Sequence, residues 1–280
     1  MNLSADYVAQ AFLREQVNLR YVTQGKQDIV MRGMGLMLTR LILHHGAMPF
    51  DSYRPRDGVN YESLRRKLQQ RTDAAVAHYE GLAKLNEDIG ELFDKEVCPT
   101  PRFVFMYGCE YTAQEFANSI CREDEYMALT SFTHHPYGSR FVLELPDNYY
   151  HDEFLNIPID TLVRYIEQAL QAGHPVCWEG DVSENLFSFA NGTAEMDDEQ
   201  KPVTQEMRQE EFERFKTTDD HCMEIIGLAS DNNGKKYFIC KNSWGTNNPY
   251  GGMMYMSENY LKCKTIAVFM PRVALKRQPF

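Results

Sequence analysis

The chain has 280 residues, of which 43% are hydrophobic and 25% are charged, and its formal net charge is −11. This is enough apolar material for the core of one large domain or of two lobes. The acidic balance argues against nucleic acid as the main partner, since phosphate binding needs clustered Lys and Arg. No apolar run approaches the roughly 20 residues of a membrane span. We therefore expect a globular protein with neither a nucleic acid nor a membrane as its partner.

The compartment stays unassigned. The first six residues, MNLSAD, lack the basic and apolar regions of a signal peptide. This favours the cytoplasm, although a longer precursor could carry a signal peptide upstream.

The seven cysteines are an odd number and show no CxxC spacing. Neither a zinc site nor a disulfide framework is indicated, because both usually show paired cysteines at characteristic spacings. We expect reduced, mostly buried thiols. We also expect no metal and no organic cofactor.

The first half of the chain is predicted to be mainly helical. Apolar residues recur at helical spacing over residues 4–21, with Ser4 as the expected N-cap. A second helix is expected to begin near Leu36 and to end before Gly46, because glycine often follows the last turn of a helix. The segment 64–92 is rich in Ala, Lys, Glu, Arg and Leu, and it predicts one or two amphipathic helices.

The second half is predicted to be mainly strands. The turn residues Asp231–Gly234 separate two apolar runs and indicate a hairpin. A helix is expected over residues 160–172 with Asp160 as its N-cap, and the polar, acidic stretch 190–215 predicts a loop or an irregular insertion. The expected strands cover residues 103–106, 127–133, 141–145, 175–178, 223–229, 235–241, 253–256 and 265–269.

Helices first and a sheet later are typical of an α+β protein with segregated lobes. We expect residues 1–125 to form a mainly helical lobe with a helical insertion at about 60–97. Residues 126–280 are expected to form a mainly antiparallel β lobe.

Two short segments near the end of the chain carry residues suited to catalysis. Asp220-His221-Cys222 opens one apolar run, and Asn242-Ser-Trp-Gly-Thr closes the next. A histidine and an asparagine on neighbouring strands can join one ring nitrogen to the amide oxygen, which leaves the other nitrogen free to activate a nucleophile. The alternative is that His221 is a satisfied core histidine and that Trp244 is core packing.

This pair of segments resembles the papain superfamily of cysteine peptidases. The resemblance implies that Asn242 fixes the tautomer and orientation of His221, and that Trp244 shields their bond from water. It further implies substrate contacts for Asp220, Trp244 and Cys222, whose matching family position lines a specificity pocket.

The resemblance extends upstream to Arg32-Gly33-Met34. It implies that the backbone of Gly33 pairs with bound peptide, because a residue without Cβ lets an extended substrate approach closely. Met34 is then expected beside the substrate. Arg32 stands where the family has a first glycine. A glycine that merely begins a helix is the alternative.

Three segments look more narrowly like the bleomycin hydrolase and aminopeptidase C branch: 129–136, 176–182 and 219–221. This implies aminopeptidase action and possible self-association, although the tail Pro271–Phe280, which in that branch limits the cleft, matches weakly. His134-His135 could suggest a metal pair. Because adjacent side chains on an extended segment point to opposite sides, we expect a structural or surface role instead.

The family nucleophile, a cysteine at the start of a central helix, and the glutamine that precedes it have no match in the sequence. Cys222 follows His221 directly on a predicted strand and so faces the other way. The chain is therefore expected to lack this nucleophile segment, as a piece of a longer enzyme, as one chain of a processed pair completed by an N-terminal chain, or as a pseudoenzyme. The predicted function is papain-like peptide hydrolysis, and the alternative is non-catalytic binding of peptides or of a partner chain.

Overall fold

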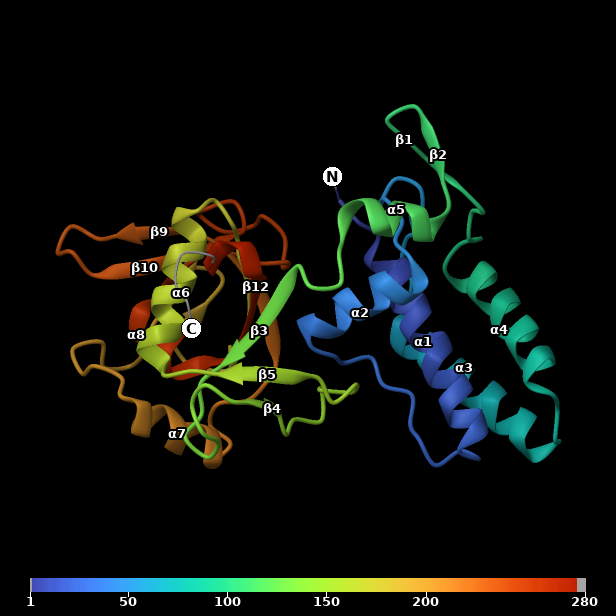
Figure 1. Cartoon of the computed structure of the whole chain (residues 1–280), viewed down its shortest axis with the longest axis horizontal. Helices are drawn as coiled ribbons and strands as arrows, with labels where there is room; N and C mark the ends of the chain where they lie inside the picture. The colour runs from blue at the N-terminus through green and yellow to red at the C-terminus, as the bar shows by residue number, and fades with distance from the viewer. Residues whose placement is uncertain (1, 276–280) are drawn as a thin grey trace. The chain divides into compact units, whose positions relative to one another are not determined.

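The computed structural model describes residues 2–275 (Figure 1). Within this range the chain forms two compact units, one of residues 2–33 and 37–123 and the other of residues 34–36 and 124–275. The end of the tail discussed above, residues 276–280, lies outside the described residues. No helix in the described part of the chain is long and apolar enough to cross a membrane.

The first unit is mainly helical, and the start of α1 and the end of α2 lie where their capping residues predict. Helix α1 begins after Ser4, whose side chain accepts a hydrogen bond from the Tyr7 backbone N–H. Helix α2 ends at His45, and Gly46 follows with φ +87° while its N–H bonds to the carbonyl of Ile42. The elements of this unit are α1 (Ala5–Val22), α2 (Gly35–His45) from Met37 onward, α3 (Tyr61–Ala77), α4 (Leu82–Glu96), β1 (Val104–Met106), β2 (Cys109–Tyr111) and α5 (Ala113–Ile120).

The segment 64–92, predicted as one or two helices, lies in the two helices α3 and α4. Both pack against each other and against α1. Leu13 of α1, Leu68 of α3 and Phe93 of α4 have no exposed surface, so each helix contributes its apolar stripe to the core.

The second unit is built on a ten-stranded sheet within the described residues, in the order β4-β5-β3-β12-β6-β9-β10-β11-β8-β7. Its pairs are antiparallel except β3–β5 and β11–β8, which are parallel. The predicted hairpin of β9 and β10 is present, with Gly234 at φ +82° in its turn. The strands are β3 (Tyr126–Thr130), β4 (Arg140–Val142), β5 (Glu153–Asn156), β6 (Val176–Gly180), β7 (Phe187–Ser188), β8 (Thr193–Ala194), β9 (His221–Ser230), β10 (Lys236–Lys241), β11 (Met253–Ser257) and β12 (Thr265–Pro271).

One long amphipathic helix covers part of this sheet. Helix α6 (Ile159–Gln171) contacts β3, β6 and β9, and its Leu162 and Ile166 belong to one core cluster with Trp178 and Phe238 of the strands. The helix is where the sequence predicts it, but its cap is not. Pro158 is the N-cap residue and Asp160 lies in the first turn, where a carboxylate favours the positive end of the helix dipole.

The prediction of a loop over 190–215 is wrong for its second half. Helix α7 (Gln205–Glu213) begins there after Thr204, whose side chain accepts from the Met207 N–H. This helix buries polar side chains, Arg208 and Gln209, in place of an apolar stripe, so hydrophobic periodicity gives no sign of it. Short helix α8 (Glu258–Lys264) was also not predicted.

Candidate active site

His221 and Asn242 are brought together at the ends of two paired strands. His221 is the first residue of β9, and Asn242 follows the last residue of β10. The Nε2–H of His221 donates to Oδ1 of Asn242 over 2.9 Å. This bond fixes one tautomer of the imidazole and leaves Nδ1 as the nitrogen able to accept a proton.

Asn242 is held so that its amide cannot turn freely. Its side chain is buried, and its Oδ1 also accepts the Ser243 backbone N–H at 2.7 Å. The backbone N–H of Asn242 donates to the carbonyl of Gly252, across a loop in which Asn248 accepts from the Gly252 N–H. The amide oxygen is therefore presented to His221 from a fixed position.

The indole ring of Trp244 lies beside the imidazole of His221, and two phenylalanines pack against that indole. The Trp244 ring centroid lies 4.8 Å from that of His221. Phe187 and Phe189 pack edge to face against Trp244, with their ring centroids 5.7 and 5.6 Å from that of Trp244. Trp244 is still 47% exposed, so it covers the histidine without being core packing.

The start of β9 is anchored to the end of β6 by two aspartates. Oδ1 of Asp220 accepts the Val182 N–H at 3.0 Å. Buried Asp181 accepts from the N–H and hydroxyl groups of Ser183 and Thr218. Although burial alone would raise it, these hydrogen bonds hold the pKa of Asp181 below its ordinary value. Asp220 thus acts on the position of His221 through the backbone.

Gly180 faces His221 across the β6–β9 pair, and we expect the Gly180→Ala variant to lose about 2–3 kcal/mol of unfolding free energy. A Cβ there would collide with the carbonyl oxygen of Lys264 and lie 2.5 Å from the Trp178 ring. Neither group can move aside easily, because the first is backbone at the end of α8 and the second is a ring with no exposed surface. Urea unfolding measures the loss. Gly227→Ala in β9 is the control, because its Cβ would meet Ile239 at an ordinary 3.4 Å. Equal stability of the two variants would contradict the prediction.

Cys222 points away from the imidazole and toward Glu179. Its thiol lies 3.7 Å from Oε1 of Glu179, the residue opposite it in β6. The neighbouring Cys177 thiol and burial raise the pKa of Cys222 well above its ordinary value. A thiol in this setting does not form a thiolate near neutral pH.

Glu179 is a buried carboxyl, 2% exposed. Burial and the nearby Asp219 raise its pKa to about 8, against the opposing effect of a hydrogen bond from the Gly35 N–H. Around neutral pH this carboxyl is largely protonated. The sequence analysis did not identify Glu179 as a candidate site residue.

The two upstream candidates lie in different units. Met34 belongs to the same unit as His221, but it is only 4% exposed and packs in a cluster with Phe132 and Phe154. Its side chain serves packing, so only its backbone could contact a peptide. Gly33 belongs to the helical unit, where a Cβ would meet the flexible end of Met37.

Comparison with protein families settles the family. Residues 105–277 match the sequence model of the Peptidase C1-like family. The chain belongs to this family. The match covers more than half of the chain and includes both His221 and Asn242. The Peptidase C1-like assignment supports a papain-like cysteine peptidase superfamily.

One solved structure agrees with this Peptidase C1-like protein in fold over almost the whole chain. The crystal structure of PepW from Lactobacillus rhamnosis HN001 is similar over 97% of this chain and 73% of its own, with a TM-score of 0.75 and 18% identity. Bromelain from Ananas comosus, in complex with the E64 inhibitor, is similar over 59% of this chain and 58% of its own, with a TM-score of 0.29 and 15% identity. The predicted α+β, papain-like fold is confirmed. No curated protein sequence matches the chain.

The structure brings His221 and Asn242 of this Peptidase C1-like chain together as the sequence predicts, but the sequence analysis did not identify the residues that support the pair. Phe187 and Phe189 lie in a stretch without clear periodicity, and nothing in the sequence joins them to Trp244. Asp181 directly follows strand β6 and lies three residues beyond the end of the predicted strand 175–178, which is a position where a buried carboxylate can bind backbone N–H groups of the next loop. The position of Asp181 after a strand could therefore have pointed to this role from the sequence.

Proposed function

We propose that this chain supplies the His-Asn part of a Cys-His-Asn cysteine peptidase. The observation that carries the proposal is the 2.9 Å bond from Nε2 of His221 to Oδ1 of Asn242 in a Peptidase C1-like chain. It leaves Nδ1 of His221 to exchange a proton with a thiol. In this proposal Asn242 orients the ring, and Trp244 limits the access of water to the bond.

The attacking thiolate would come from a cysteine outside these 280 residues. Cys222, the cysteine next to His221, is directed to Glu179 and has a raised pKa. A nucleophile of this class needs the opposite, a pKa lowered by a helix N-terminus and an imidazolium. The family segment with its glutamine and cysteine would meet that need and would provide the oxyanion hole.

The proposed reaction is hydrolysis of a peptide or amide bond in two steps. The thiolate attacks the carbonyl carbon, and His221, protonated at Nδ1, gives that proton to the leaving amine, which departs from a thioester. Water then attacks the thioester while His221 takes its proton, and the acid leaves as the thiolate is restored. No metal or organic cofactor enters either step.

We assign the enzyme to the bleomycin hydrolase and aminopeptidase C branch on the three sequence segments 129–136, 176–182 and 219–221. Aminopeptidase action, self-association and completion by an N-terminal chain belong to this proposal. So does the division of the chain into a helical lobe, 1–125, and a β lobe, 126–280, that carries His221 and Asn242. The two-helix element α3–α4 fits the helical insertion of that branch.

The test is gain of activity. We expect residues 1–280 alone to leave aminoacyl and peptidyl fluorogenic amides uncleaved. We expect a longer protein, in which a family segment with glutamine and cysteine is joined to residues 1–280, to cleave these amides in a thiol-dependent way. The matched control replaces the added cysteine by serine. A folded, extended protein that binds peptide without cleaving it would favour the non-catalytic alternative.

A further inference from the structure

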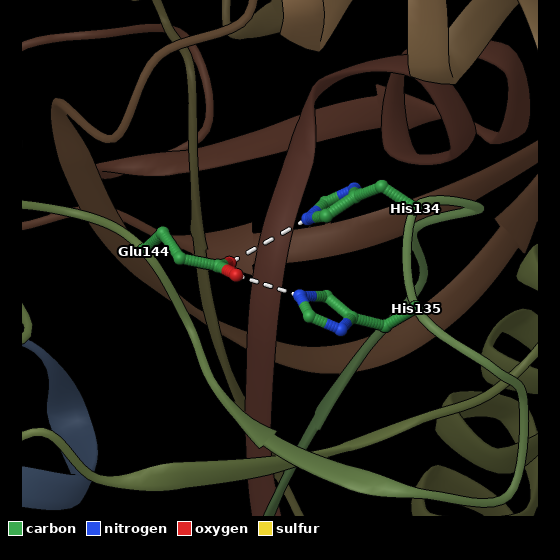
Figure 2. A group of neighbouring side chains, drawn as sticks. All are labelled: His134, His135 and Glu144. Carbon is green, nitrogen blue, oxygen red and sulfur yellow. Dashed lines mark hydrogen bonds and ion pairs between the residues drawn. The ribbon is translucent and has the colours of Figure 1, made fainter.

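His134 and His135 aim at one carboxylate. The two residues lie in a turn after β3, not on an extended strand, so the prediction that they point to opposite sides is wrong. Nε2 of His135 lies 2.6 Å and Nε2 of His134 3.5 Å from the oxygens of Glu144, which follows β4 (Figure 2). One ligand atom from each residue lies within 4.8 Å of the other two.

We propose that His134, His135 and Glu144 bind a divalent transition-metal ion of the zinc type. Two imidazole nitrogens and one carboxylate oxygen are a ligand set that zinc accepts, with bonds of about 2.0–2.2 Å. The Nε2 atoms of His134 and His135 and a carboxylate oxygen of Glu144 could surround such an ion if Glu144 moved slightly away from His135, whose Nε2 is 2.6 Å from it. Three protein ligands also leave a coordination position for water.

Aromatic packing holds both rings in the converging orientation. The His135 ring stacks on Phe141 with centroids 3.9 Å apart and an interplanar angle of 22°. The His134 ring is nearly parallel to Phe212 of α7, at 8° and 5.9 Å. Rings held in this way need little reordering to bind an ion.

The site is open to an ion from solvent. About a third of each histidine side chain is exposed, 32% for His134 and 30% for His135, and Glu144 is 57% exposed. Although burial opposes it, hydrogen bonding to His135 holds the pKa of Glu144 below its ordinary value. The carboxylate is therefore already charged for a cation.

One contact of His134 has to change when a metal binds. The Gln209 amide nitrogen lies 3.0 Å from Nδ1 of His134 and also donates to Glu213, while its oxygen accepts the Thr133 N–H. Gln209 thus donates to Nδ1 of His134. A metal bound at Nε2 would leave the ring proton of His134 on Nδ1, so the Gln209 amide nitrogen would have to move away from that atom.

The test is cobalt binding to the 280-residue chain after treatment with a chelator. Co²⁺ is added at neutral pH, and its visible d–d absorption and isothermal titration calorimetry report coordination and affinity. We expect one equivalent to bind without sulfur-to-cobalt charge transfer, and Zn²⁺ to displace it. Glu144→Gln and His134→Ala should each weaken binding at least tenfold.

His78→Ala is the matched control, because it removes an exposed histidine of the other unit. Glu144→Gln keeps the shape of the side chain, and circular dichroism checks that each variant is folded. Ligand variants that bind as tightly as the control, a charge-transfer band from thiolate, or no saturable binding would each overturn the site. The readout is independent of peptidase activity, so failure of the proposed function leaves this test intact.

Discussion

Replacing His221 by alanine lowers kcat/KM of the completed enzyme on the order of 10⁴- to 10⁶-fold in our proposal. The loss is this large because the same ring activates the thiol and protonates the leaving amine, so both chemical steps fail together. Steady-state hydrolysis of a fluorogenic amide measures it. His174→Ala, which removes a half-buried histidine from the turn after α6, is the control and should change the rate less than about twofold.

Asn242→Ala separates orientation from proton transfer. The imidazole would keep its chemistry but lose the 2.9 Å bond that fixes its tautomer, so we expect a smaller loss, on the order of 10². If both variants were as active as the control, His221 and Asn242 would not be the catalytic pair, whatever the identity of the nucleophile.

Replacing Glu179 by glutamine should remove a pH dependence of stability. The carboxyl has an ordinary pKa of 4.5 in the unfolded chain and about 8 in the folded protein. Between these two values the folded state binds the additional proton, so folding stability decreases as pH rises from about 4.5 to 8. The upper limit of the change is about 4 kcal/mol. Stability from this carboxyl is fully present below the lower pKa and is lost as pH rises through the upper one.

Glutamine can still accept the Gly35 N–H but does not titrate. Urea unfolding at pH 5, 6, 7 and 8 should therefore show Glu179→Gln gaining on the parent protein as pH rises, with the largest difference at pH 8. Glu224→Gln is the control, since Glu224 is exposed on the adjacent strand β9. A constant difference between Glu179→Gln and the parent across this pH range would contradict the raised pKa.

The parts of the fold that were predictable depend on local patterns. Ser4 caps α1 and Gly234 turns the β9–β10 hairpin because the chemistry of these positions lies within a few residues. The His221–Asn242 pairing was also predictable, because a short hairpin brings the two strand ends together. Helix α7 was not, since it is held by buried polar side chains whose partners lie far along the chain. Arg208, for example, donates to the carbonyl of Ser131 at 2.8 Å.

The Glu179 and His134 environments show the same limit. Strand alternation in 176–180 places Cys177 and Glu179 on one face, but it does not say that Gly35, 144 residues away along the chain, covers that carboxyl. For His134 and His135 the error was the assumption of an extended backbone. A turn at these residues brings both rings to the same side.

The contrast between the two tryptophans gives this protein an optical probe of its own. The chain has two, and Trp178 has no exposed surface whereas Trp244 is 47% exposed beside His221. A collisional quencher such as acrylamide reaches only the second indole, so the quenchable part of the ultraviolet emission comes from Trp244, beside the imidazole of His221. Binding of a ligand beside His221, or a change in the charge of the His221 ring, can therefore be followed through Trp244 fluorescence in the unlabelled protein.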